Sequence, residues 1–128
     1  MFMIYQRPMS TAQVDAVNRN PESSLSKAYM GLLFPNEDNA QERVNAALNV
    51  GLYQKTMLIG ATDGLSVTLE QVFDAGNGYP GEGVNVVSMG SHPSMSVGDI
   101  AVSLLDDDAY LCMPHGWHVL DLTLDLVY

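Results

Sequence analysis

Two stretches of the chain carry the sequence signature that begins a helix. In residues 10–13 and again in residues 68–71, a Ser or Thr is followed three positions later by Gln, which is the spacing of a capping box. Apolar residues then recur on one helical face. We expect the first helix to run to about Asn18 and the second to end at Gly76. A third helix is expected over residues 39–49.

Residues 28–34 fit either a helix or a strand. Apolar residues have helical spacing from Leu25 onward, but Gly31 interrupts the run and Pro35 closes it. The balance favours a strand over Ala28 to Phe34.

The other apolar segments have the length and the flanking turns of strands. In the last one, leucines alternate with Asp or Thr, which is typical of a strand with one buried and one solvated face. The expected strands are residues 2–7, 53–59, 84–89, 100–105, 109–113 and 117–127. Together these elements predict a single α+β domain over residues 1–128. Its sheet is expected to be mixed or antiparallel, with two to four short helices and a C-terminal half that is mostly β.

Length and cysteine content narrow the class of protein. A chain of 128 residues that is 47% hydrophobic can bury a core without disulfides. The single cysteine, Cys112, excludes an intramolecular disulfide and suits a reducing compartment. Only five apolar residues precede the polar Gln6. This run is too short for a signal peptide or a membrane span. We therefore expect a cytoplasmic protein.

Charge is distributed unevenly along the chain. All five Lys and Arg residues lie in the first 55 positions, whereas the segment from Thr56 to Tyr128 has ten Asp and Glu and carries the whole net charge of −10. A field of one sign repels nucleic acid and anionic membranes and attracts basic surfaces. The alternative is that the acidity only keeps the protein soluble.

One segment has residues that could bind a metal or act as a nucleophile. Cys112, His115 and His118 lie within seven positions, and His92 could join them. Structural zinc sites usually draw four ligands from two such segments, and no second Cys or His pair exists. A turn between two strands explains the segment more simply. We therefore expect no catalytic residue, no metal and no cofactor.

The second half of the chain resembles a known family. Residues 94–100 read Ser-Met-Ser-Val-Gly-Asp-Ile, residues 110–112 read Tyr-Leu-Cys, and Gly116-Trp117 follows. This pattern is similar to the YodL-like domain of small phage and mobile-element proteins, and residues 69–73 resemble its Leu-Glu-x-x-Phe helix. The resemblance covers about residues 53–120. It implies a phage or mobile-element origin and life in a bacterial host cell, and it assigns no residue a role.

From the residues alone, Gly98-Asp99 is expected to form a fixed bend before Ile100, because Gly tolerates unusual φ and Asp can accept from backbone N–H groups.

The acidic half and the suspected origin lead to one functional hypothesis. The protein would be a phage-encoded inhibitor or modulator that occupies the basic surface of a host nucleic-acid-binding protein or defence complex, such as a restriction or CRISPR complex, by nucleic-acid mimicry. No direct binding of nucleic acid or membrane is expected. The expected contact residues are Asp106, Asp107, Asp108, Asp121, Asp125, Asp63, Glu70, Asp74 and Glu82.

Two alternatives stay open at this point. One is a metal-dependent module or small enzyme around Cys112, His115, His118 and His92. The other is a self-associating accessory protein, since eight methionines could line an adaptable interface.

Overall fold

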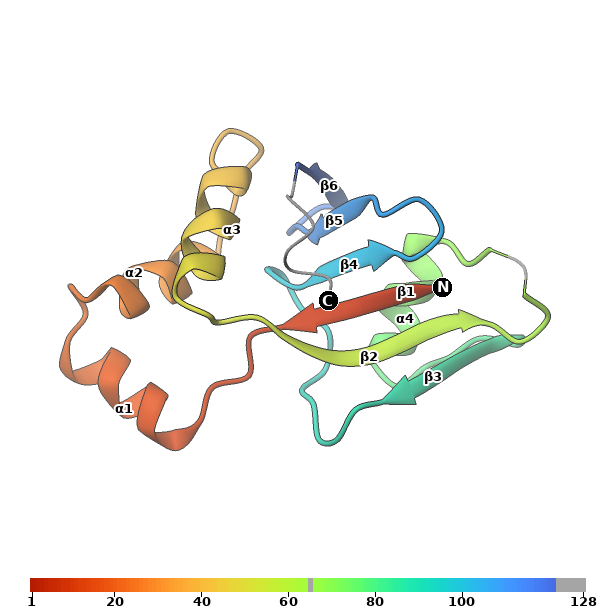
Figure 1. The fold of residues 1–128 in the computed structure, drawn as a ribbon, viewed down its shortest axis with the longest axis horizontal. Coiled ribbons are helices and arrows are strands. Elements are labelled where there is room, and N and C mark those ends of the chain that lie inside the picture. The colour runs from red at the N-terminus through yellow and green to blue at the C-terminus, as the bar shows by residue number, and fades with distance from the viewer. Residues whose placement is uncertain (65, 122–128) are drawn as a thin grey trace.

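A six-stranded antiparallel sheet organises the chain (Figure 1). The computed structural model describes residues 1–64 and 66–121. The strand order is β3-β2-β1-β4-β5-β6. The strands are β1 (Phe2–Gln6), β2 (Gln54–Ala61), β3 (Val84–Ser88), β4 (Ile100–Ser103), β5 (Ala109–Cys112) and β6 (Trp117–Leu120). The helices are α1 (Thr11–Arg19), α2 (Ser24–Gly31), α3 (Ala40–Asn49) and α4 (Leu69–Gly76). The predicted α+β class and the mostly β second half are confirmed.

The first strand lies in the middle of the sheet. β1 pairs with β2 on one side and β4 on the other, so that Phe2 lies opposite both Ile59 and Ser103. Because neighbouring strands are antiparallel, the start of β1 shares one end of the sheet with the ends of β2 and β4 and the starts of β3 and β5. We call this the Phe2 end of the sheet.

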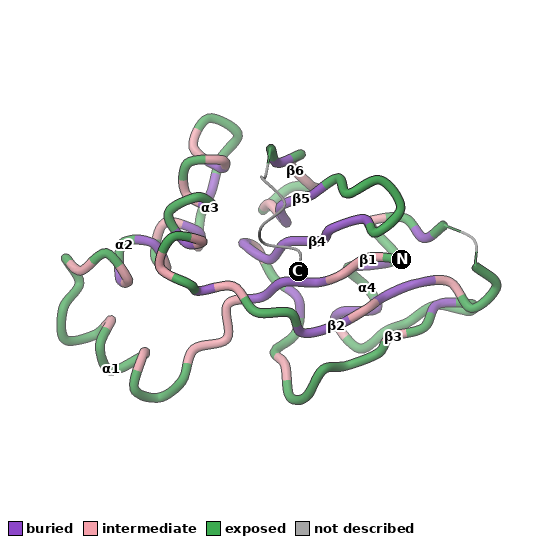
Figure 2. The backbone as a smooth tube through the Cα atoms, in the orientation of Figure 1, coloured by how far each residue is buried: buried purple, intermediate pink, exposed green. Residues whose placement is uncertain are grey.

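The two faces of the sheet pack against different helices. Along β1, Ile4 joins the core that α4 covers, while Tyr5 joins the core formed with α2 and α3. This alternation follows from the two-residue period of a strand. In Figure 1, α1 to α3 form a group beside one end of the sheet, and α4 lies behind the sheet. Figure 2 shows the central strands as the most continuously buried part of the backbone, while the connecting loops are largely exposed.

Both predicted capping boxes are present. Ser10 accepts a hydrogen bond from the Gln13 N–H, and Thr68 accepts one from the Gln71 N–H, while each Gln side chain accepts from the backbone of its N-cap residue. These bonds satisfy N–H groups that a helix start otherwise leaves without partners. The sequence therefore predicted these two starts to the residue.

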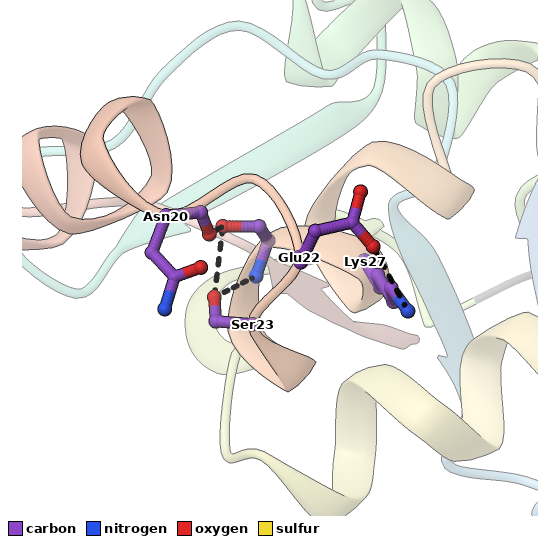
Figure 3. A network of polar contacts seen from close by, with 5 residues as sticks. Asn20, Glu22, Ser23 and Lys27 are labelled. Atoms are coloured by element: carbon purple, nitrogen blue, oxygen red, sulfur yellow. Dashed lines mark hydrogen bonds and ion pairs between the residues drawn. The ribbon is translucent and has the colours of Figure 1, made fainter.

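The corner between α1 and α2 is fixed by serine side chains (Figure 3). Ser23 is the N-cap of α2 and accepts from the Ser26 N–H at 3.1 Å. The buried Ser26 hydroxyl donates to the Asn20 carbonyl oxygen at 2.6 Å. The nearby pair of Lys27 and Glu22, 3.4 Å apart, is largely exposed and contributes little to stability.

The strand predicted over Ala28 to Phe34 is wrong. Residues 28–31 form the last turn of α2. Ala28 is buried, and so is Leu32, which lies one turn later, directly after the helix. Gly31 does not break the helix, because it is its last residue and its carbonyl oxygen accepts from the Arg43 guanidinium at 2.7 Å. The helical spacing was the correct indication, and Pro35 lies beyond the helix end.

The ends of β1 to β5 differ from the predicted bounds by at most two residues; β2, for example, ends at Ala61 rather than 59. β4 ends at Ser103 rather than 105, because the chain turns at once toward β5 and leaves Leu104 and Leu105 exposed. β6 is described over Trp117–Leu120, and residues 122–127 of the predicted last strand lie outside the described residues.

Candidate functional site

Eight of the nine predicted contact residues lie in the described part of the chain, and all eight are exposed. The ninth, Asp125, lies outside it. Five of the eight come from three loops at the Phe2 end of the sheet (Figure 1). We call this set the acidic end: Asp63 after β2, Glu82 before β3, and Asp106, Asp107 and Asp108 between β4 and β5.

The turn between β4 and β5 carries three of these acidic residues and has a backbone that hydrogen bonds hold in place. The Asp107 N–H donates to the Ser103 carbonyl oxygen, and the Ser103 N–H donates to that of Asp108, both at 2.8 Å. The Asp106 carboxylate accepts from the Asp108 N–H at 3.1 Å. Asp107 itself has a φ of 62°, in the left-handed region. A preformed turn loses little conformational entropy when a partner binds.

Asp121 is positioned from another part of the chain. Its N–H donates to Gln41 Oε1 at 2.7 Å, and Gln41 Nε2 donates to its carbonyl oxygen at 2.8 Å. These bonds hold the backbone beside the start of α3 and leave the carboxylate exposed. Because Leu120 is the partner of Ala109, Asp121 follows β6 at the same end of the sheet as Asp108, on the side that adjoins α3.

The basic residues lie elsewhere. Arg7 follows β1 and Lys55 pairs with Tyr5, so both belong to the opposite end of the sheet from Phe2. The other three, Arg19, Lys27 and Arg43, lie on α1, α2 and α3. The five residues of the acidic end therefore lie away from the Lys and Arg residues, whereas Asp99, another acid of the second half, lies beside Arg7.

Glu70 and Asp74 form a second acidic position on α4. They are four residues apart, so they lie on the same side of the helix. They line a groove of about 280 Å³ together with Phe73, Met113 and Trp117. The sequence placed these acids in the same set as the others, but the fold puts them on the helix behind the sheet.

Among the described residues, Cys112 has no activated thiol, and the Cys and His side chains form no metal site. Cys112 is buried, and burial, assisted by the charge of Asp99, raises the pKa of its thiol to about 12. A nucleophilic cysteine needs a lowered pKa. His92 lies 3.0 Å from the Ser88 hydroxyl. Within residues 1–64 and 66–121, no three His, Cys, Asp or Glu side chains converge on a position for a metal ion.

A buried polar cluster at the opposite end of the sheet was not predicted as a site. Asp99, only 3% exposed, accepts from Gln6 Nε2 at 3.0 Å and from the Ser96 N–H at 2.8 Å, both through Oδ2. Burial raises the pKa of this carboxyl to about 6, against the opposing effects of these two bonds and of the Arg7 charge. The expected bend at Gly98-Asp99 is confirmed, with Gly98 at a φ of 94°.

Arg7 links this cluster to the helices. Its guanidinium donates to the Val97 carbonyl oxygen at 3.2 Å and to that of Tyr29, on α2, at 3.1 Å. It also lies 5.2 Å from the centre of the Tyr29 ring. Arg7 and Asp99 line a pocket of about 440 Å³. The feature of the sequence that could have indicated this cluster is the polar pair Gln6-Arg7 at the end of an apolar strand.

Comparison with known proteins gives no relative. No protein-family model matches the chain, and neither does any curated protein or solved structure. The resemblance to the YodL-like domain therefore stays a prediction. Throughout the described residues, no helix has the length and apolar character needed to cross a membrane.

Proposed function

We propose that the protein binds through its acidic end to a basic, nucleic-acid-binding surface of another protein and thereby inhibits or modulates that protein. The observation that supports this most is the gathering of five exposed carboxylates from three loops at one end of the sheet, away from the Lys and Arg residues. The suspected phage origin adds a class of partner, a host restriction or CRISPR complex.

The mechanism is competition for cations. Proteins that bind nucleic acid obtain much of their affinity from Lys and Arg contacts to phosphates. Carboxylates held on a fixed frame can occupy the same cations. Complementary charge also speeds the encounter of the two proteins, and salt weakens this effect because exposed charges are screened.

The test compares two variants of equal charge. One changes Asp106, Asp107 and Asp108 to Lys, and the control changes Asp15, Glu22 and Glu37, which are exposed in or beside the helical group, to Lys. The partner is first isolated from a bacterial lysate with the unmodified chain, and the association rate is then measured against salt concentration. We expect the first variant to associate at least about tenfold more slowly, with a flatter salt dependence, and the control to change little.

Three results would contradict the proposal. Equal slowing by both variants would mean that net charge alone matters. Unchanged association in the Asp106, Asp107 and Asp108 variant would place the acidic end outside the interface. Competition by duplex DNA for the isolated partner is expected, and its absence would argue against a nucleic-acid-binding surface.

A further inference from the structure

A groove with both charged and aromatic walls lies between α4 and the turn that joins β5 to β6. Its volume is about 280 Å³. From α4 it is lined by Glu70, Phe73 and Asp74, and from the other side by Met113 and Trp117. In Figure 1, α4 occupies the far side of the sheet. The turn after β5 lies at the opposite end of the sheet from Phe2, so the groove is separate from the acidic end.

The lining residues share an affinity for cations. Glu70 and Asp74 are exposed carboxylates on one side of the helix. Phe73 is 38% exposed and Trp117 is half-buried, so aromatic surface is open to the groove. The face of an aromatic ring attracts a cation, and Trp does so most strongly. Among the described residues that line the groove, none is a Lys or Arg that would neutralise the carboxylates.

We propose that this groove binds the guanidinium group of an arginine side chain on the partner protein. The inference rests on the proposed function, because it assumes a partner with a basic surface, and it identifies one residue type of that surface. A guanidinium is planar and weakly hydrated, stacks on aromatic rings and donates in pairs to carboxylates. The ammonium group of lysine has a stronger hydration shell and no planar face.

Trp117 provides a direct probe, because it is the only tryptophan of the chain and it lines the groove. The peptide acetyl-Gly-Arg-Gly-amide is titrated into the full chain while the indole N–H resonance and the fluorescence of Trp117 are followed. Two matched peptides carry lysine or the neutral isostere citrulline in place of arginine. We expect saturable binding of the arginine peptide in the millimolar range, with citrulline at least tenfold weaker and lysine several-fold weaker.

A pair of variants locates the binding. Glu70→Gln with Asp74→Asn should weaken arginine binding at least tenfold. Asp15→Asn with Glu22→Gln removes the same charge from exposed positions in and beside the helical group and should leave arginine binding unchanged. Far-UV circular dichroism checks that both variants keep their helix content.

Equal affinity for the arginine and citrulline peptides, or for the arginine and lysine peptides, would overturn the inference. So would equal effects of the two variants, or no response of Trp117 at all. If Trp117 fails to respond while reversal of Asp106 to Asp108 still slows association with the isolated partner, the groove assignment fails and the proposed function stands. The reverse pattern would contradict the role of the acidic end and retain the groove.

Discussion

Gln6 and Asp99 are 93 positions apart in the sequence and share a buried hydrogen bond of 3.0 Å from Gln6 Nε2 to Asp99 Oδ2. Gln6 is the last residue of the central strand, and Asp99 directly precedes β4. Nε2 also lies 3.2 Å from the Pro93 carbonyl oxygen, so the amide donates to the loop before β4 as well. The bond thus fixes that loop against the end of β1.

The burial of Asp99 predicts a dependence of stability on pH. Its pKa in the folded protein is about 6, above the ordinary 3.8, so folding favours the protonated carboxyl. The stabilisation is complete below about pH 4 and is lost as the pH rises to about 6 and beyond. A shift of this size corresponds to at most about 3 kcal/mol.

Urea unfolding of the wild type and Asp99→Asn between pH 4 and pH 7 measures this effect. Because the other acids titrate in both proteins, the informative quantity is the free energy of unfolding of the wild type minus that of the variant. We expect this difference to fall by about 2–3 kcal/mol as the pH rises. A constant difference would show that the Asp99 carboxyl titrates alike in the folded and unfolded chains.

Gly98 is expected to tolerate no side chain. Its φ of 94° is unfavourable for other residues, and a Cβ there would lie 2.9 Å from the Leu32 carbonyl oxygen and against the Arg7 guanidinium. We expect Gly98→Ala to lower the free energy of unfolding by roughly 3 kcal/mol.

The matched control for this substitution is Gly116→Ala. Gly116 has a φ of 78°, but nothing lies within 4 Å of its added Cβ. Only the backbone penalty of about 1 kcal/mol should appear. Similar losses of stability in the two variants, measured by urea unfolding, would mean that Arg7 and Leu32 move aside at little cost.

Cys112 is expected to resist thiol reagents in the folded protein. With a pKa of about 12, its thiolate fraction at pH 8 is about a thousandfold below that of an ordinary cysteine. The rate of alkylation by iodoacetamide should therefore be lower by at least that factor in the native protein than in urea. Rapid native alkylation would indicate an accessible thiolate and would revive the nucleophile hypothesis.

Asp107, at the acidic end, is expected to lower the free energy of unfolding. Its φ of 62° is left-handed, and two more acids flank it. Asp107→Gly should raise the free energy of unfolding by about 1 kcal/mol, since glycine adopts this φ freely. Asp107→Asn removes the charge alone, so an equal gain in both variants would assign the cost to charge repulsion rather than to the backbone. Thermal unfolding at low salt measures both.

Local patterns were sufficient for the elements that have local causes. Both capping boxes and the positions of the strands were predicted because each signal lies within a few residues. The prediction for residues 28–34 was wrong because two local signals conflicted there. The helix is stabilised by the burial of Ala28 and Leu32 against strands that are distant in the sequence. Propensity is a weak guide when tertiary packing opposes it.

The candidate site shows the same division. Exposure of the acidic residues could be predicted from composition, but their gathering at the Phe2 end depends on strand order, which no local pattern encodes. Asp99 looked like an ordinary turn residue, because the strand that buries it lies at the other end of the chain. Likewise, nothing in the sequence brings Glu70 beside Trp117; the groove exists only once α4 packs behind the sheet.

The central place of β1 has a consequence for how the chain folds during synthesis. Its second neighbour, β4, ends at Ser103, so the ribosome must reach at least this residue before the first strand can complete its pairing. Contacts between residues this far apart slow folding, because a long loop must close before they form. Until then β1 has an unpaired edge that could associate with another chain. A substitution that slows the docking of β4 should therefore lower the yield of folded protein in cells more than its effect on equilibrium stability would suggest.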